Sequence, residues 1–262
     1  MNARSGWLTA TAALNLLFLY VPILVLIVFS FNASRYSASW HGFTGQWYRA
    51  LLDDRTLLES VWNSVIVAVS STAIAVILGV PAAIGLERLV PSRQRLAEAG
   101  LVLPLVIPEI MLGVSLMLLF VTIHWPLSLL TVTVGHAAFN LPVVILIVRA
   151  RLRRLDPHLT EAARDLGATA AQAFRRITLP LLLPAIAGGA LMAFTISFDD
   201  FLVTFFTGGP GSTTLPLKVY SMVKAGVSPM INAISAIIVL ISMGCVAAAL
   251  LLQRAGAVPN EK

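Results

Sequence analysis

Cysteine is almost absent from this chain of 262 residues, which contains Cys245 alone. A single thiol cannot form an intrachain disulfide, so we expect Cys245, which lies in an apolar run, to be a small packing residue. Lysine is nearly as scarce, and no GxxxxGKS or GxxxxGKT sequence occurs; the lysines are Lys218, Lys224 and Lys262. Without that phosphate-binding motif, we expect no nucleotide site of the P-loop type in this chain.

Other signatures of enzymes and nucleic-acid-binding proteins are also missing. No serine lies in a nucleophile elbow. The net charge is +6, but the basic residues are spread over loops and form no patch interleaved with aromatic residues. The sequence therefore predicts neither an enzyme nor a nucleic-acid partner. The histidines show no metal-ligand spacing, so we expect structural or interfacial roles for them and no metal site; they are His41, His124, His136 and His158.

Charged residues make up only 11% of the chain and hydrophobic residues 58%, with a mean hydropathy of +0.89. These values lie outside the range of soluble domains. Six apolar runs are long enough to cross a bilayer as helices, and Pro104 and Pro108 interrupt the third. We predict an all-α integral membrane protein with one domain over 1–262. Its six spans are expected at about 8–31, 61–86, 97–121, 128–148, 181–206 and 231–252.

The distribution of basic residues predicts the orientation of these spans. Six spans place both termini on one side, and most of the 18 basic residues lie on that side. The opposite side has fewer of them: Arg35, Arg49, Arg55, Lys218 and Lys224. Because cytoplasmic loops carry the excess of positive charge, we predict cytoplasmic N and C termini.

The longest polar stretch, 155–184, contains orderly helix signals between two apolar spans. Asp156 followed by Pro157 is typical of a helix start, and Gly167 of a helix stop. Thr169 and Gln172 have the spacing of a capping box that starts a second helix. We predict two short helices joined at Gly167 on a membrane surface. The stretch either anchors the fold at the interface or docks a partner.

One spacing in this stretch matches a known signature, EAA-x3-G-x9-I-x-L-P. Its fixed positions are Glu161, Ala162, Ala163, Gly167, Ile177, Leu179 and Pro180. The stretch thereby resembles that of permease subunits of bacterial ABC importers. The resemblance implies the type I importer permease fold, with 149–180 as a cytoplasmic coupling loop that docks on an ATPase. Docking becomes the favoured interpretation, and anchoring alone the lesser one.

The resemblance extends to most of the chain and to a subgroup. The segments 30–32, 103–120 and 198–233 are similar to those of spermidine/putrescine permeases, most closely the second permease of such pairs. This implies a polyamine importer of the bacterial inner membrane, with a second permease, a periplasmic or extracellular solute-binding protein, and ATPase subunits that hold ATP and magnesium. The alternatives are another small amino compound as cargo, an ion-coupled secondary transporter, or a structural membrane subunit.

Three carboxylates, Glu109, Asp199 and Asp200, fall inside predicted spans. Ionisable groups are costly there and usually face a cavity or a partner. From a rise of about 1.5 Å per residue, Glu109 is expected near the middle of the third span and the aspartates near the outer end of the fifth. We predict that Glu109 lines a pathway or pairs helices.

On a regular helix, neighbouring residues are about 100° apart, so Asp199 and Asp200 would not face one path. Asp200 would share a face with Ser197, Thr204 and Thr207, and is the pathway candidate. Asp199 would instead contact a helix or a subunit; alternatively, the pair only caps or packs the helix end. Phe198 is expected to favour an organic cation through cation–π attraction. Asn140 is expected more as an interhelical hydrogen-bonding group than as a cargo contact.

Overall fold

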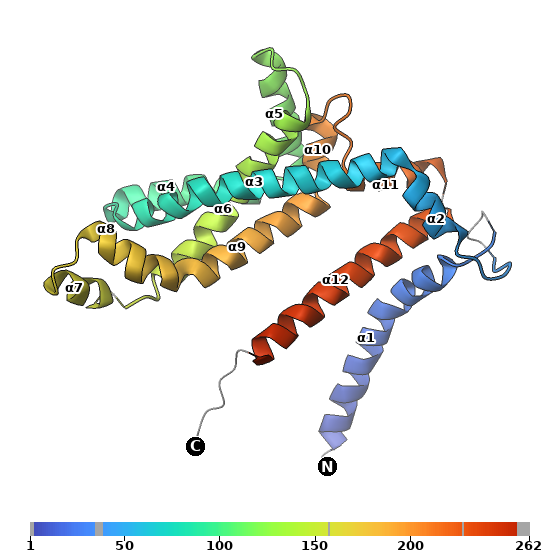
Figure 1. The fold of residues 1–262 in the computed structure, drawn as a ribbon, viewed down its shortest axis with the longest axis horizontal. Helices are drawn as coiled ribbons and strands as arrows, with labels where there is room; N and C mark the ends of the chain where they lie inside the picture. Colours follow the sequence, from blue (N-terminus) through green and yellow to red (C-terminus); the bar gives the residue numbers. More distant parts are fainter. Residues whose placement is uncertain (1–2, 35–38, 157, 227, 256–262) are drawn as a thin grey trace. The chain divides into compact units, whose positions relative to one another are not determined.

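The computed structural model describes residues 3–34, 39–156, 158–226 and 228–255, and its named elements are all helices (Figure 1). Within these residues, β pairing is limited to one isolated bridge between Asn32 and Phe43. The prediction of an all-α chain is confirmed. The helices are α1 (Ala3–Phe29), α2 (Gln46–Asp53), α3 (Arg55–Glu87), α4 (Pro91–Val106), α5 (Glu109–Thr122), α6 (Leu129–Leu152), α7 (His158–Asp165), α8 (Ala170–Ala173), the π-helix η1 (Phe174–Thr178), α9 (Leu179–Asp199), α10 (Leu202–Thr207), α11 (Leu215–Ala225) and α12 (Pro229–Ala255).

The chain contains two compact units, Met1–Leu58 with Val219–Lys262 and Glu59–Lys218. In the first unit, α12 contacts both α1 and α2. The connection after α1 is organised by Asn32, whose side chain is buried. Its amide donates to the carbonyl of Ser39 at 2.7 Å, and its oxygen accepts from the backbone of His41 at 2.9 Å. The indole of Trp47 donates to the Asn32 carbonyl at 2.7 Å, so one asparagine fixes this connection.

The second unit is built around α6, which contacts α4, α5, α9 and α10 (Figure 1). Its core consists of small and branched apolar side chains from α3, α6 and α9, which bury one another away from any solvent. The buried members are Ala75, Ala83, Val144, Ile145, Val148, Leu182 and Ala193. This core occupies the C-terminal half of α6, between the polar side chains of its first half and the ion pairs of Arg149, which are described below.

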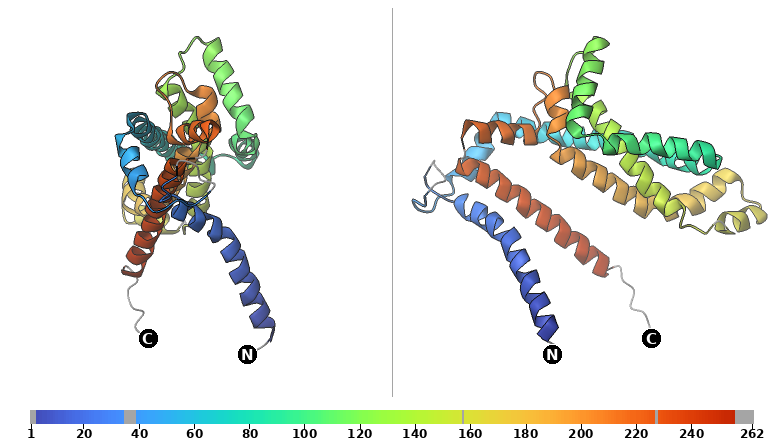
Figure 2. Two further views of the ribbon diagram at one scale, coloured as in Figure 1. Left: turned by 90° about the vertical axis from the view of Figure 1, so that its right-hand side faces the viewer. Right: turned by 180° about the vertical axis from the view of Figure 1, so that it is seen from behind.

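Two of the predicted spans are not single helices, and of the two prolines predicted to interrupt the third span only Pro108 lies at a break, since Pro104 lies inside α4. In the third predicted span, α4 ends at Val106 and α5 begins at Glu109 with a bend of 101° (Figure 2). Ile107 is extended there, as expected for a residue before proline, and Pro108 lacks the N–H that a continuing helix requires. In the fifth, α9 ends at Asp199 and α10 begins at Leu202, because Asp200 is extended at ψ 130°. The regular helix expected through 206 is therefore wrong.

Four helices of the described chain are long and apolar enough to cross a membrane: Trp7–Phe29, Arg55–Glu87, Leu129–Leu152 and Ala170–Asp199. The bent pair of α4 and α5 is a fifth if it counts as one span. Over the sixth predicted run lies α12, which is apolar over Pro229–Ile241, where its side chains are described. The side chain of Cys245, also in α12, lies outside the described residues. The protein is thus a multi-pass membrane protein, whereas the count of six spans and the cytoplasmic termini stay predictions.

Candidate functional site

A cavity of about 640 Å³ lies within the second unit, where α4, α5, α6, α9 and α10 meet. All three carboxylates of the predicted spans, Glu109, Asp199 and Asp200, line it. We call it the acidic cavity. The rest of its lining is mostly apolar: Pro104, Leu105, Ile107, Leu112, Phe139, Val143, Met192, Thr195, Ile196, Phe201 and Leu202.

The three carboxylates meet because both helix breaks lie at this cavity. Glu109 is the first residue of α5, where the positive end of the helix dipole favours a carboxylate. Asp199 ends α9, and Asp200 lies between α9 and α10. The α5 and α10 helices pack closely, since a Cβ on Gly113 would lie 2.8 Å from a ring carbon of Phe206. Irregular backbone inside a membrane protein is tolerated where it lines such a cavity.

The break at Asp200 overturns the face argument for the aspartates. Because the helix is not regular there, both Asp199 and Asp200 line the acidic cavity. Asp199 is an exposed member of that lining. The Asp200 side chain is only 6% exposed, because it caps α10. One carboxylate oxygen, Oδ1, accepts from the backbone N–H of Val203 at 3.3 Å, and the other, Oδ2, from that of Thr204 at 2.9 Å.

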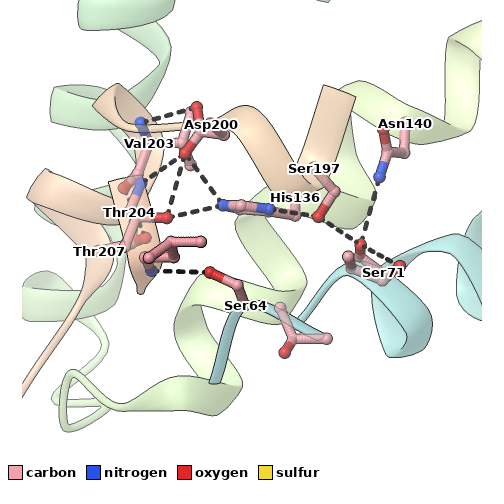
Figure 3. A network of polar contacts seen from close by, with 12 residues as sticks. Ser64, Ser71, His136, Asn140, Ser197, Asp200, Val203, Thr204 and Thr207 are labelled. Atoms are coloured by element: carbon pink, nitrogen blue, oxygen red, sulfur yellow. Dashed lines mark hydrogen bonds and ion pairs between the residues drawn. The ribbon is translucent and has the colours of Figure 1, made fainter. Parts of the chain in front are cut away.

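His136 of α6 is the residue that the sequence analysis missed. It is fully buried and lies behind Asp200 (Figure 3). Its Nε2 lies 3.1 Å from Asp200 Oδ2 and 3.0 Å from Thr204 Oγ1, and its Nδ1 lies 2.7 Å from Ser197 Oγ. Metal-ligand spacing was the wrong criterion for this residue. The available signal was its position inside a predicted span, where an ionisable side chain indicates a partner.

Neither Asn140 nor Phe198 lines the acidic cavity. Asn140 is buried in α6 and donates to Ser71 Oγ of α3 at 3.2 Å, which is the interhelical hydrogen bond favoured from the sequence. Phe198 stacks on Phe194 with ring centroids 5.8 Å apart. The aromatic lining comes from Phe139 and Phe201 instead. Phe198 was misplaced because its position was estimated from the chain distance to the aspartates alone.

The first part of the EAA motif lies on α7 and in the turn that joins α7 to α8, and we call these two short helices the EAA hairpin (158–173). As predicted, the helices are joined at Gly167, whose φ of +85° favours glycine. The predicted capping box is present: Gln172 N donates to Thr169 Oγ1 at 3.3 Å, and Thr169 N donates to the Gln172 side chain at 2.9 Å. Asp156 accepts from His158 N at 3.0 Å, whereas Pro157 lies outside the described residues.

The EAA hairpin presents an exposed surface. Glu161 and Ala162 are exposed, Ala163 is half-buried, and Leu166 is 89% exposed. A shallow hollow of about 470 Å³ lies beside them, lined by Glu161, Arg164, Asp165, Gly167, Ala168 and Thr169. An apolar side chain as exposed as Leu166, next to a mixed polar hollow, is typical of a surface that contacts another protein.

The end of the EAA motif joins the hairpin directly to a long helix. Ile177 lies in the π-helix η1, and Leu179 and Pro180 are the first residues of α9. From Ala170 to Asp199 the chain is helical throughout, so one helical segment carries the motif at one end and Asp199 of the acidic cavity at the other.

A cluster of ion pairs lies where α6 approaches the EAA hairpin. The guanidinium of Arg149 is buried, with Nε 2.6 Å from Glu87 of α3 and Nη2 in contact with Glu98 of α4. Arg153, which is half exposed, bonds the same two carboxylates at 2.9 and 3.0 Å. The cluster ties α3 and α4 to the end of α6.

Within the part of the chain that the structure describes, no group of three His, Cys, Asp or Glu is placed to hold a metal ion.

Comparisons with known proteins agree on one family. The model of the binding-protein-dependent transport system inner membrane component matches residues 75–256. The spermidine/putrescine transport system permease protein PotC of Escherichia coli strain K12 is 39% identical over 251 residues, 96% of this chain and 94% of that protein. The putrescine transport system permease protein PotI of the same strain is 41% identical over 242 residues, 90% of this chain and 86% of that protein.

The fold has a solved counterpart. A chain in the crystal structure of a bacterial ABC transporter involved in the import of the acidic polysaccharide alginate superposes with a TM-score of 0.71 at 19% identity. The match covers 97% of this chain and 98% of that one, and supports the predicted permease fold. On these grounds, the chain belongs to the family of binding-protein-dependent transport system inner membrane components.

Proposed function

We propose that this protein is a permease subunit of an ABC importer for polyamines such as putrescine and spermidine. The observation that carries the proposal is the convergence of Glu109, Asp199 and Asp200 on one cavity at two helix breaks. Relatives whose names specify spermidine and putrescine transport support it.

The acidic cavity has the chemistry that a polyamine requires. A polyamine is a flexible chain of methylene groups with two or more ammonium groups. Ammonium groups pair with carboxylates through charge-assisted hydrogen bonds, and the Phe139 and Phe201 rings favour the cation and its methylene groups. Carboxylates inside a membrane are costly without a partner. A cargo of several positive charges would neutralise them together, which a neutral or singly charged compound would not.

We further propose that the EAA hairpin docks on an ATPase subunit that holds ATP and magnesium, and that this chain has no nucleotide site of its own. Leu166 and Glu161 are exposed for such a contact. Because α8, η1 and α9 are continuous, a rigid shift of the hairpin would move Asp199 at the far end of α9. At about 1.5 Å per residue, α9 transmits that shift over roughly 30 Å.

The remaining partners follow from the same assignment. The permease works with a second, different permease, and a periplasmic or extracellular binding protein delivers the cargo. The protein lies in the bacterial inner membrane, with its termini and the EAA hairpin in the cytoplasm. The binding protein selects the cargo first, so binding of polyamines and other small amino compounds to that partner would establish the cargo class.

The proposal is tested by uptake of labelled putrescine and spermidine into proteoliposomes that contain the complete complex. Asp199→Asn and Asp200→Asn should each raise the KM for uptake about tenfold, since each removes a charge-assisted contact. Asp199→Glu keeps the charge and should stay near wild type. Unchanged uptake of both polyamines in all neutral variants would contradict the cavity assignment. Uptake driven by an ion gradient without ATP would indicate a secondary transporter instead.

A further inference from the structure

His136 has no place in the pathway as described, yet it is a buried polar residue whose ring contacts three other side chains. It is absent from the lining of the acidic cavity and fully buried. Its ring nevertheless contacts Ser197 of α9, Thr204 of α10 and the Asp200 carboxylate between them (Figure 3). A single side chain of α6 therefore bridges both sides of the break between α9 and α10.

The hydrogen-bonding roles at His136 follow from its partners. A carboxylate only accepts, so the Nε2 beside Asp200 Oδ2 must carry the proton. In the neutral ring, Nδ1 is then the acceptor, and the hydroxyl of Ser197 donates to it at 2.7 Å. In this tautomer the ring donates a hydrogen bond to Asp200 but does not cancel its negative charge. That charge then remains available to a cation in the cavity.

The donors behind His136 are arranged in one direction. Asn140 donates to Ser71 Oγ at 3.2 Å, and Ser71 Oγ lies 3.1 Å from Ser197 Oγ (Figure 3). With Ser197 donating to His136, the Ser71 hydroxyl can donate to Ser197 at 3.1 Å instead of to the Ala68 carbonyl at the longer 3.4 Å, and each O–H or N–H of the series then points toward Asp200. Such aligned donors polarise one another and strengthen the last bond, which is the one to the carboxylate.

The arrangement fixes one oxygen of Asp200 and spares the other. Oδ2 accepts from Thr204 N at 2.9 Å and Thr204 Oγ1 at 3.1 Å, besides the contact with His136. Oδ1 has a single bond of 3.3 Å from Val203 N. Oδ2 therefore has all its hydrogen bonds within the protein, whereas Oδ1 can accept a further hydrogen bond. Because Asp200 lines the acidic cavity, a cargo ammonium group could supply that bond. Asp199, by contrast, is exposed.

We propose that His136 is a positioning residue that holds Asp200 as a charged, oriented carboxylate for the cargo, without touching the cargo itself. This inference rests on the proposed function, because it assumes that Asp200 contacts a polycation. It predicts that His136 acts through Asp200 alone. If His136 had only a structural role, its substitution would instead disturb the fold equally with aspartate or asparagine at position 200.

The test is a double-substitution cycle in the complete complex, measured as putrescine uptake into proteoliposomes. His136→Phe keeps a buried ring but removes both nitrogens, and should raise the KM about tenfold with the maximal rate within about twofold. In the Asp200→Asn background, His136→Phe should add less than about twofold. His136→Gln retains one donor and one acceptor, and its KM should stay within about threefold of wild type.

Thr131→Val is the matched control, because Thr131 is equally buried on α6 and also bonds across to the α10 end, through the Thr207 carbonyl at 2.8 Å. It should leave the KM unchanged. The inference would be overturned if Thr131→Val raised the KM as much as His136→Phe does. It would also be overturned if the increases in KM caused by His136→Phe and by Asp200→Asn multiplied in the double variant. If His136→Phe does not assemble, the smaller apolar variant His136→Leu, which also removes both nitrogens, carries the cycle, and a KM raised as far in its Asp200→Asn background as alone would overturn the inference too. An unchanged KM in Asp200→Asn alone would instead contradict the proposed function.

Discussion

The EAA hairpin and the acidic cavity hold their residues in place by different means. In the hairpin, hydrogen bonds join near neighbours, such as Gln172 with Thr169 and His158 with Asp156. Behind the cavity wall, they join residues far apart in the chain, such as His136 with Ser197 and Thr204. The hairpin surface is exposed, whereas the supports of the cavity are buried. Substitutions in the hairpin should therefore affect contacts with partners, and substitutions behind the cavity should affect the fold or the cargo.

The largest effect is expected outside both regions, at the buried Arg149 near the end of α6. Arg149→Met should destabilise the protein by about 3 kcal/mol, because it leaves Glu87 and Glu98 without their buried partner. Arg153→Met is the matched control, since Arg153 bonds the same carboxylates but is half exposed, and it should cost less than about 1 kcal/mol. Thermal unfolding of the purified complex measures both. Equal midpoints for the two variants would show that burial does not decide the effect.

A smaller effect, confined to function, is expected in the EAA hairpin. Leu166→Asp places a charge on an exposed apolar contact and should lower substrate-stimulated ATP hydrolysis at least tenfold. Glu161→Lys should act in the same direction through charge reversal. Leu166→Met keeps the contact apolar and serves as the control. Neither Leu166→Asp nor Glu161→Lys should change the thermal midpoint of the permease. If either variant lowered the thermal midpoint but left substrate-stimulated ATP hydrolysis normal, the hairpin would affect stability as the buried residues do, and the contrast between the two regions would fail.

The smallest effect is expected at Gly167 in the hairpin turn. Its φ is +85° and a Cβ would meet open space, so Gly167→Ala should cost only about 1 kcal/mol of backbone strain. Gly188→Ala in α9 also meets open space but has helical backbone, and should be neutral or slightly stabilising. Comparing the thermal midpoints of these two variants tests whether the turn is held by local backbone conformation. A stabilising Gly167→Ala would argue against the left-handed turn.

The same contrast explains what could be predicted from the sequence. Gly167, Thr169 and Gln172 act on their neighbours, so the two short helices and their turn could be predicted from local signals. The carboxylates could be found because ionisable residues in apolar runs are conspicuous. Their geometry could not, since it depends on the break at Asp200, which no proline or glycine marks. Asp200 itself ends the helix by capping α10 and bonding His136, and both interactions require the folded arrangement of α6, α9 and α10.

His136 illustrates the limit most clearly. Its partners Ser197 and Thr204 are more than sixty residues away in the chain, so spacing could not connect them. Phe198 shows the converse error, since it is adjacent to the aspartates in sequence but stacks on Phe194 outside the cavity lining.

The central claim is that Glu109, Asp199 and Asp200 form one site for a polycation. The most direct measurement is the structure of the complete complex trapped with spermidine and a non-hydrolysable ATP analogue. The account predicts density for the extended cargo within the acidic cavity, with its ammonium groups in contact with Asp199 and Asp200. Cargo density at another place in the permease, with this cavity empty, would contradict it.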